Sequence, residues 1–220
     1  MRQHVNPLSS FFQLPVKLPL PEELFLNADL PIHLDIGSAR GQFLLDYAEI
    51  QRNWNFLGVE IRQSLVASAN NDVEHKNLKN VRFLFCNANV SLQSWLDELP
   101  FGLLQRVSIQ FPDPWFKRRH HKRRVLQPSL LTSLAKSMKP GSELFLQSDC
   151  LSVIQPMTEL IEKSFCFDPH TVNNYNWLAE NPCLIKSERE IYAINKGLLI
   201  YRILYKRNNN QSNLKLLELS

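Results

Sequence analysis

The sequence predicts an α/β protein in which one mostly parallel β-sheet is covered by helices on both faces. Short apolar runs alternate with segments of helical spacing from about residue 32 onward, the rhythm of consecutive strand, helix and strand units. A further helix and strand follow six such strands, which indicates a seventh strand. With 220 residues, 44% of them hydrophobic, the chain can bury one sizeable core, and we expect a single domain.

The individual elements follow from the same patterns. Apolar runs predict strands at residues 32–36, 56–61, 81–86, 106–111, 143–147, around 167–172 and 198–205. Helical spacing predicts helices at residues 42–51, 63–75, 92–99, 129–138 and 153–163. Ser187 and Glu190 have the spacing of a capping box, so another helix begins there, and Gly197 closes it.

The two ends of the chain differ in composition from the region between them. Residues 1–31 hold five prolines and little periodicity, so we expect an irregular N-terminal arm. Residues 32–207 contain all of the predicted strands and form the expected domain. Residues 208–220 begin with a polar stretch of low complexity, where we expect a mobile tail.

Composition argues against several classes of protein. The four cysteines form no C-x-x-C pair, so neither a zinc site nor a disulfide framework is indicated, and free thiols suit a reducing cytoplasm. The first apolar residues are soon interrupted by Lys17 and prolines, which is unlike a signal peptide. No apolar run approaches the length of a membrane span, and no feature indicates an obligate protein partner.

Positive charge is concentrated in one short segment. The stretch KRRHHKRR at residues 117–124 contains six lysines and arginines, more than the net charge of +4 of the whole chain, so the remainder is slightly acidic. A local basic patch on such a protein is typical of a surface that binds a polyanion. We expect the polyanion to be RNA, because the segment adjoins a predicted site; the alternatives are a solvated helix face and a nuclear-localisation segment.

Three strand ends predict a nucleoside pocket. Gly37 and Gly41 follow the first strand and allow tight turning and the close approach of a ligand. Glu60 ends the second strand, where an acid can accept both hydroxyls of a ribose, and the Asn87 amide is placed to pair with an adenine edge. The turn lacks the signatures of a phosphate-binding loop and of a dinucleotide site. A cofactor with ribose and adenine but no pyrophosphate, such as S-adenosylmethionine, fits best; an ordinary turn is the alternative.

The segment IQFPDPWFKRRHHKRR at residues 109–124 changes abruptly from an apolar strand to the basic run. Asp113 lies between two prolines, which stiffen its backbone and direct its carboxylate to the rim of the same pocket. Trp115 offers a flat face to a purine, and a carboxylate can accept the N–H groups of the Watson–Crick edge of guanine. We interpret the segment as a purine site; the alternative is a proline-rich turn with a structural tryptophan.

Together these motifs resemble the bacterial tRNA (guanine-N7-)-methyltransferases, a family with the Rossmann-like, seven-stranded fold of S-adenosylmethionine-dependent methyltransferases. The resemblance is carried by RQHVNPLS, DIG, GVEI, NA, FPDPWFKRRHHKRR, QSD and SERE, which span almost the whole chain. FPDPW with its basic tail is the most specific of them. The resemblance implies transfer of a methyl group from S-adenosylmethionine to N7 of a guanosine in tRNA, at position 46 in the variable loop.

The resemblance also implies roles for individual residues. Asp113 would be the catalytic residue. The cofactor would be bound by Asp35, Gly37, Glu60, Asn87, Ala88 and Asp113. The substrate guanosine would be bound by Lys117, Asp149, Ser187, Glu188, Arg189 and Glu190. The RNA would be bound by Arg119, His120, His121, Lys122, Arg123 and Arg124. The alternatives are that Asp149 is a helix N-cap and that Ser187 and Glu190 only cap their helix.

Some residues depart from the pattern of the family. Asp35 stands where glutamate is usual, Ala39 replaces the middle glycine of the turn, and Phe116 stands where histidine is usual. We expect Ala39 to tighten the turn. Two other functions remain open. A nucleobase amino-methyltransferase would use an Asp-Pro-Pro-aromatic motif, whose second proline is missing here, and a non-catalytic RNA-binding module would keep the fold without the reaction.

Overall fold

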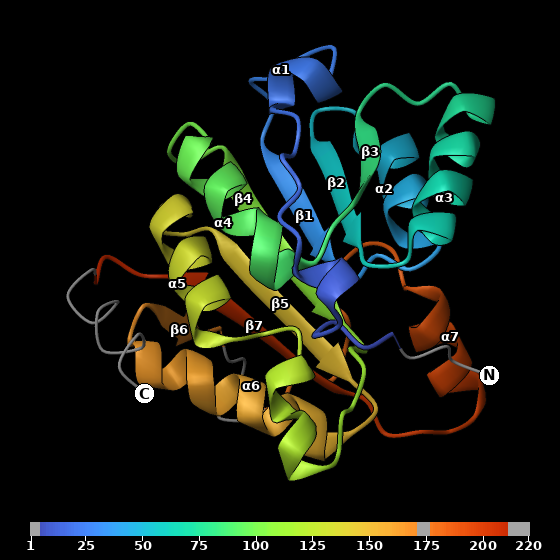
Figure 1. Ribbon diagram of the computed structural model, residues 1–220. Coiled ribbons are helices and arrows are strands. Elements are labelled where there is room, and N and C mark those ends of the chain that lie inside the picture. Colours follow the sequence, from blue (N-terminus) through green and yellow to red (C-terminus); the bar gives the residue numbers. More distant parts are fainter. Residues whose placement is uncertain (1–4, 171–176, 211–220) are drawn as a thin grey trace.

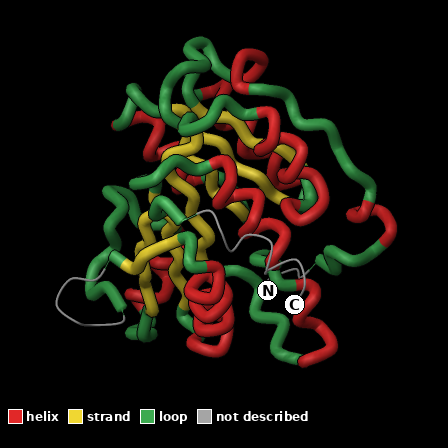
Figure 2. Tube along the Cα trace, turned by 90° about the vertical axis from the view of Figure 1, so that its left-hand side faces the viewer, coloured by secondary structure: helices red, strands yellow, loops and turns green. Residues whose placement is uncertain are grey.

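The computed structural model describes residues 5–170 and 177–210. Seven strands form one sheet in the order β3-β2-β1-β4-β5-β7-β6. Helices lie on both sides of this sheet (Figure 1 and Figure 2). The predicted fold class is therefore confirmed. None of the helices within the described ranges is long and apolar enough to cross a membrane.

The strands follow the predicted order. They are β1 (Ile32–Ile36), β2 (Asn55–Glu60), β3 (Val81–Phe85), β4 (Leu104–Gln110), β5 (Glu143–Ser148), β6 (Phe167–Pro169) and β7 (Tyr201–Arg207). Strands β1 to β5 pair in parallel. Strand β7 lies between β5 and β6 and runs antiparallel to both.

The helices alternate with the strands. The α-helices of the domain are α2 (Gln42–Ile50), α3 (Gln63–His75), α4 (Ala88–Glu98), α5 (Pro128–Ser137), α6 (Leu151–Ser164) and α7 (Glu188–Asn195). The basic run forms a short 3₁₀ helix, η2 (Arg118–Arg123). Two further short helices, η1 (Ser10–Gln13) and α1 (Pro21–Leu24), lie in the predicted arm.

Alternating side chains of the strands build two apolar cores, one on each face of the sheet. Leu57 and Val59 of β2 belong to the core formed with α4, α5 and α6, whereas Phe56 belongs to the core formed with α2 and α3. Strand β5 divides in the same way, because Leu144 and Leu146 face one core and Phe145 faces the other. This alternation explains why the central strands carry apolar residues on both of their faces, since both faces are covered.

The order of the strands determines where a ligand can bind. From β1 the chain moves outward through β2 to β3, and it then returns to the other side of β1 with β4 and β5. The helices that follow β1 and β4 therefore diverge to opposite faces of the sheet and leave a crevice at the carboxyl ends of these strands. Ligands of open α/β sheets bind at such a reversal of strand order.

Several predicted boundaries differ from those in the structure. The helix expected at residues 92–99 begins earlier, at Ala88, because the side chain of Asn87 accepts a hydrogen bond from Asn89 N and caps it. The strand expected at residues 198–205 begins at Tyr201, the first residue that pairs with β5. Strand β6 ends at Pro169, and the end predicted near residue 172 lies outside the described residues.

The N-terminal arm packs along helix α4. Val16 N donates a 3.0 Å hydrogen bond to Ser91 Oγ, and Trp95 Nε1 donates a 2.9 Å bond to Pro19 O. Figure 1 shows the arm running across the front of the sheet from near the carboxyl end of β1 up to α1. The division into arm, domain and tail stays a prediction, and most of the predicted tail lies outside the described residues.

Candidate active site

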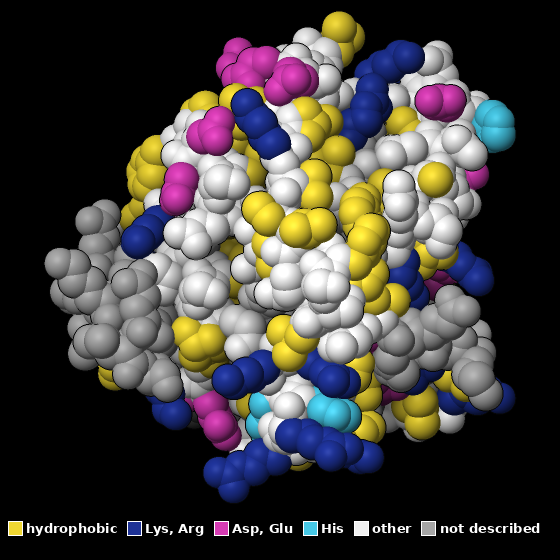
Figure 3. All heavy atoms as spheres, in the orientation of Figure 1, with side chains coloured by type: hydrophobic (Ala, Val, Ile, Leu, Met, Phe, Trp, Pro, Cys, Tyr) yellow, Lys and Arg dark blue, Asp and Glu magenta, His cyan; other side chains and the backbone are white. Residues whose placement is uncertain are grey.

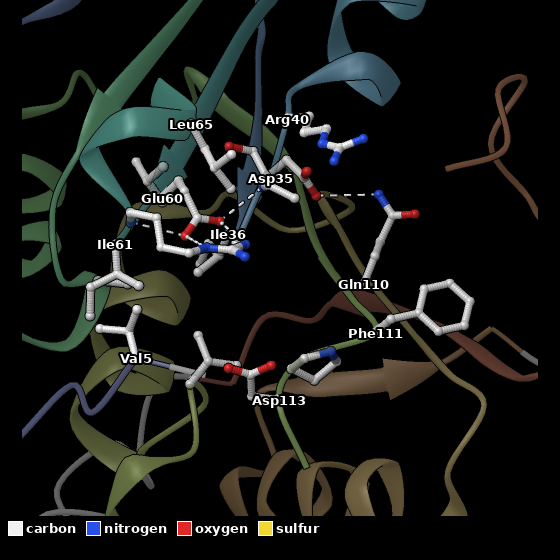
Figure 4. Close-up of a pocket in the computed structure, with 18 of the residues that line it drawn as sticks. Val5, Asp35, Ile36, Arg40, Glu60, Ile61, Leu65, Gln110, Phe111 and Asp113 are labelled. Atoms are coloured by element: carbon white, nitrogen blue, oxygen red, sulfur yellow. Dashed lines mark hydrogen bonds and ion pairs between the residues drawn. The ribbon is translucent and has the colours of Figure 1, made fainter. Parts of the chain in front are cut away.

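A cavity of about 870 Å³ opens at the carboxyl ends of the central strands. Its wall combines segments that lie far apart in the sequence: the glycine turn after β1, the ends of β2 and β3, residues 110–115, residues 187–189 and part of the arm. Figure 4 shows the carboxylates of Asp35, Glu60 and Asp113 around this space. The fold thus brings three of the predicted site residues together.

The glycine turn forms one edge of the cavity. Gly37 has a φ of +85°, and a Cβ added there would meet no atom within 4 Å, so the turn leaves open space beside its backbone. Gly41 is required for a different reason, because its Cβ would lie 2.5 Å from the ring of Phe83. Ala39 has a φ of 51°, a left-handed conformation that is unfavourable for a residue with a side chain.

Glu60 is held rigidly at the end of β2. Its Oε2 accepts a 2.9 Å hydrogen bond from Ala39 N, which ties it to the glycine turn. Its Oε1 accepts bonds from the backbone N and the Nε of Arg62 at 3.0 and 2.8 Å. These bonds raise the pKa of the Arg62 guanidinium, and the nearby charge of Asp113 contributes in the same direction. Arg62 Nη2 also donates a 3.1 Å bond to Oε2, so a ribose diol could bind the Glu60 carboxylate only if the half-buried Arg62 side chain moved aside.

Asp35 is a buried carboxylate at the end of β1. Its Oδ1 accepts a 2.6 Å hydrogen bond from Ser108 Oγ and a 3.3 Å bond from Gln110 Nε2. Burial raises the pKa of Asp35 to about 6, although these two hydrogen bonds oppose the rise. Both bonds use the same oxygen, so Oδ2 is left for a ligand in the cavity.

The Asn87 amide binds the N-terminal arm. Its Nδ2 donates to Pro7 O at 3.0 Å and to Phe12 O at 3.1 Å, while its Oδ1 caps helix α4. Both amide hydrogens are therefore used in this structure, and the adenine contact that we predicted for them would require the arm to move. Val5 and Pro7 of the arm line the cavity themselves.

Residues 111–115 form a strained loop after β4. Phe111 and Trp115 both have positive φ values, 46° and 38°. Phe111 N donates a 2.7 Å hydrogen bond to Gln147 O of the neighbouring strand, which fixes the start of the loop. Between these two residues, prolines on both sides of Asp113 restrict the backbone. Such strain is maintained only where the surrounding structure enforces it, and it is typical of functional sites.

The basic run continues from this loop along one end of the molecule. Lys and Arg side chains gather with histidines at the lower end of the view in Figure 3, where η2 lies. Lys117, Arg118, Arg119 and Lys122 are exposed. Arg123 is half-buried, lines the cavity and lies 5.0 Å over the Trp115 ring. Arg123 therefore connects the basic surface with the tryptophan.

Asp149 and Arg189 form an ion pair on the opposite side of the cavity, between the end of β5 and the start of α7. Arg189 also lies 4.7 Å over the ring of Tyr192. Helix α6 begins at Leu151 with Cys150 as its N-cap, so the alternative that Asp149 caps this helix is wrong. Asp149 instead orients Arg189, which is itself part of the cavity wall.

Glu190 lies behind the cavity wall and is completely buried. Its Oε1 accepts hydrogen bonds from Arg202, and its Oε2 accepts bonds from Gln147 and Asn181. Ser187 Oγ accepts a bond from Glu190 N, so the first half of the predicted capping box is present. The second half is absent, because the Glu190 carboxylate turns into the core.

Comparisons with known proteins agree with this geometry. A family model described as "Putative methyltransferase" matches residues 29–203. The tRNA (guanine-N(7)-)-methyltransferase of Prochlorococcus marinus (strain MIT 9313) is 60% identical over 212 residues, which is 96% of this chain and 90% of that protein. The protein of the same name from Parasynechococcus marenigrum (strain WH8102) is 59% identical over 94% of this chain and 88% of its own length. The chain belongs to the tRNA (guanine-N(7)-)-methyltransferase family.

Solved structures resemble this family member in fold. Precorrin-6y C5,15-methyltransferase from Geobacter metallireducens GS-15 has a TM-score of 0.51 and 14% identity, with 86% of each chain covered. An rRNA methylase from Streptococcus thermophilus also has a TM-score of 0.51, at 9% identity over 86% of this chain and 92% of that one. The seven-stranded sheet thus has the fold of these solved methyltransferases.

The cavity of this methyltransferase fits S-adenosylmethionine. Carboxylates suit the two ends of this cofactor, since Glu60 can accept ribose hydroxyls and Asp35 can accept an ammonium group. The open space beside Gly37 allows a ligand to approach the backbone closely. The absence of a Gly-Lys-Ser/Thr sequence agrees with a cofactor that has no phosphates.

The structure brings some of the predicted site residues of this methyltransferase into the cavity and leaves others outside it. The cavity wall contains Asp35, Gly37, Glu60, Asn87, Ala88, Asp113, Arg123, Ser187, Glu188 and Arg189. The wall does not contain Lys117, Arg119, His120, His121, Lys122, Arg124, Asp149 and Glu190. Most of the second group lies on the basic surface, whereas Asp149 and Glu190 support residues of the wall.

Sequence reasoning missed several residues of this site. Arg62 follows Glu60 by two positions, and its closeness to a strand-end acid was a usable signal. Gln110 is a polar residue at the end of a buried strand, which was a second signal. Val5 and Pro7 reach the cavity only through the path of the arm, for which the sequence offers no periodic pattern.

Proposed function

We propose that this protein transfers the methyl group of S-adenosylmethionine to N7 of a guanosine in tRNA, at position 46 in the variable loop, and acts in the cytoplasm. The main support is the meeting of three carboxylates, Asp35, Glu60 and Asp113, around one cavity that adjoins a basic surface. The first two suit a cofactor with a ribose and an ammonium group, and the third faces them from the segment that leads into the basic run.

The chemistry of guanine limits what the protein has to supply. N7 carries a lone pair that is unprotonated at neutral pH, so its methylation needs no general base. When bound, S-adenosylmethionine supplies an electrophilic methyl group on a sulfonium. The protein has to hold N7 in line with that group and keep the two reactants together, and such positioning can lower a barrier by ~7–11 kcal/mol.

Residues of the strained loop would carry out this positioning. Asp113 would accept hydrogen bonds from the guanine edge and compensate the positive charge that develops on the purine during transfer. Trp115, backed by the Arg123 guanidinium at 5.0 Å, would support the flat face of the base. Arg189, oriented by Asp149, would confine the guanosine from the opposite wall.

The basic surface would bind the RNA backbone. Arg119, His120, His121, Lys122, Arg123 and Arg124 are the residues proposed for this role, whereas Lys117 is proposed to bind the substrate guanosine. Exposed cations bind phosphates mainly through charge, so this surface would contribute affinity and little sequence preference.

The test is to incubate the purified protein with methyl-labelled S-adenosylmethionine and unmodified tRNA transcripts. Label should enter the RNA, and chain cleavage selective for 7-methylguanosine should occur at one variable-loop guanosine. Label without such cleavage would favour a nucleobase amino-methyltransferase. RNA binding without cofactor binding, measured by calorimetry, would favour a non-catalytic RNA-binding module.

A further inference from the structure

A row of three polar side chains runs through the core behind the cofactor cavity. Asp35 and His33 are two residues apart on β1 and so share one face of the sheet. Ser108 of β4 pairs with Asp35 in the register of the two strands and lies between the two side chains. Ser108 Oγ lies 2.6 Å from Asp35 Oδ1 and 2.9 Å from His33 Nε2. His33 and Ser108 are fully buried, and only Asp35 reaches the cavity.

Hydrogen-bonding capacity fixes the direction of both bonds. An ionised carboxylate can only accept, so the single hydroxyl hydrogen of Ser108 is donated to Asp35. His33 Nε2 must then donate to Ser108 Oγ, which sets the tautomer with the proton on Nε2. Burial lowers the pKa of His33 well below its ordinary value, so the imidazole stays neutral and acts as a donor through one nitrogen.

Packing alone does not explain a histidine at this position. Its ring makes edge-on contacts with Phe43 and Tyr47, with ring centroids 5.8 and 5.7 Å apart. An apolar ring would make the same contacts. In addition, His33 Nδ1 is buried and has no hydrogen-bond partner among the described residues, which costs ~1–3 kcal/mol. The unpaired nitrogen is a cost that an apolar ring would avoid, and the one hydrogen bond of the imidazole is directed at Ser108.

The ionisable groups around this row come from β2, from β4 itself, from α2 and from the segment that contains Cys183. Glu60 faces Asp35 from β2, and its charge opposes ionisation of Asp35. Arg106 of β4 lies near His33 and favours its neutral form. Tyr47 of α2 and Cys183 complete the surroundings, and both have a raised pKa and stay uncharged at neutral pH. Apart from Gln110, Ser108 supplies the only side-chain hydrogen bond to Asp35 within the described residues.

We propose that Ser108 and His33 are positioning residues that keep the Asp35 carboxylate ionised and oriented to receive the ammonium group of the cofactor. The proposal rests on the proposed use of S-adenosylmethionine. His33 acts through Ser108, and Ser108 acts through Asp35, so neither touches the cofactor. Without the hydroxyl, Asp35 would keep its burial and its repulsion from Glu60 but lose its shorter hydrogen bond.

The test compares two ligands by calorimetry between pH 5 and 8. S-adenosylhomocysteine carries the ammonium group, whereas 5′-methylthioadenosine keeps the adenosine and lacks that group. The wild type should bind S-adenosylhomocysteine with an affinity that falls as the pH drops through about 6, as Asp35 is protonated. Its affinity for 5′-methylthioadenosine should not fall over this pH range.

Ser108→Ala should weaken S-adenosylhomocysteine binding at pH 7 by roughly tenfold or more, because a hydrogen bond to a charged group is lost. In this variant the loss of S-adenosylhomocysteine binding on acidification should also begin at a higher pH, and 5′-methylthioadenosine binding should be unchanged. His33→Phe should act in the same direction with a smaller effect. Ser108→Thr keeps the hydroxyl, so its affinity for S-adenosylhomocysteine should fall at the same pH as that of the wild type. Ser142→Ala removes another buried hydroxyl, which is hydrogen-bonded to Leu104 O at the amino end of β4, away from the cavity. It should change the binding of neither ligand.

Two results would overturn the proposal. Equal weakening of both ligands by Ser108→Ala would mean that the hydroxyl only supports the fold. If the pH dependence of S-adenosylhomocysteine binding were unchanged in Ser108→Ala, ionisation of Asp35 would not depend on the Ser108 hydroxyl. Failure of the wild type to bind either ligand would instead contradict the proposed function, and this result is distinguishable because it requires no variant.

Discussion

Arg202 Nη2 donates a 2.9 Å hydrogen bond to Glu190 Oε1, and this buried ion pair joins strand β7 to the start of helix α7. The pair is part of a longer polar path, because Gln147 Nε2 bonds both Glu190 and Gln110, and Gln110 in turn bonds Asp35. The helix that presents Ser187, Glu188 and Arg189 to the cavity is thereby connected through hydrogen bonds to the carboxylate on the cofactor side.

Glu190→Leu should destabilise the protein strongly, because it leaves the Arg202 charge buried without its partner. Breaking a buried pair in this way costs about 3–5 kcal/mol. The free energy of unfolding from urea titration measures the loss. Glu188→Leu is the matched control, since Glu188 is exposed in the same helix, and it should change the stability little. Equal effects of the two substitutions would contradict an anchoring role for Glu190.

Ala39→Gly should stabilise the turn. Ala39 has a φ of 51°, and the left-handed conformation costs a residue with a side chain ~1–2 kcal/mol. Part of the gain is offset by the greater freedom of glycine in the unfolded chain, so we expect a net increase of up to ~1 kcal/mol. Gly41→Ala is the reciprocal change and should destabilise, because its Cβ would meet Phe83 at 2.5 Å. Urea titration of both variants checks the pair, and a destabilising Ala39→Gly would refute the strain argument.

Asn87→Ser should release the N-terminal arm and leave helix α4 intact. Serine keeps an oxygen that can cap the helix, but it lacks the two hydrogens that Asn87 donates to Pro7 O and Phe12 O. We expect faster proteolytic cleavage within residues 5–16 and an unchanged melting temperature of the domain. Asn80→Ser is the control, because Asn80 Nδ2 donates hydrogen bonds to backbone carbonyls near the amino ends of the strands, away from the arm. Arm cleavage at the wild-type rate in Asn87→Ser would show that other contacts hold the arm.

Replacing Arg118, Arg119 and Lys122 by alanine should weaken tRNA binding without lowering turnover at saturation. The three side chains are exposed, and each phosphate that is no longer neutralised should reduce the log–log salt slope by ~0.7–0.9. A matched control set consists of Arg52, Lys79 and Lys139. These residues are exposed and precede β2, β3 and β5, so they lie near the amino ends of the strands, away from the cavity. A similar decrease of tRNA affinity in the control set would show that charge alone, and not this surface, binds the RNA.

Most of the fold was predictable because its signals are local. The five parallel strands are rich in apolar residues, and the helices between them have regular spacing, so each element could be located from its own residues. The start of α4 was missed because Asn87 interrupts an apolar pattern while capping the helix. The shape of the arm was not predictable, since its contacts with Ser91 and Trp95 join residues about 75 positions apart.

The site was predictable where function depends on a strand end and less so where it depends on distant partners. Glu60 and Asp113 were located correctly at the cavity because strand ends of a parallel sheet converge. The Glu190 carboxylate was expected in the site, but Arg202, Gln147 and Asn181 draw it into the core. Asn87 was expected to contact adenine, but the arm, 75 to 80 residues earlier, uses its amide. The roles of both residues stay predictions, and the hydrogen bonds that occupy them here are long-range ones that no local sequence pattern indicates.

The most direct test of methyl transfer to guanosine 46 combines one active-site variant with one altered transcript. Wild-type protein should methylate a tRNA transcript at guanosine 46, shown by cleavage selective for 7-methylguanosine, and should fail on the transcript with adenosine there. Asp113→Asn should bind the tRNA normally but lose turnover by ~100-fold or more, because the carboxylate no longer compensates charge on the purine. Asp97→Asn, an exposed residue of α4, should behave as the wild type. Near-normal turnover of Asp113→Asn, or label that enters the transcript with adenosine at position 46 as fast as the unaltered one, would contradict the proposed reaction.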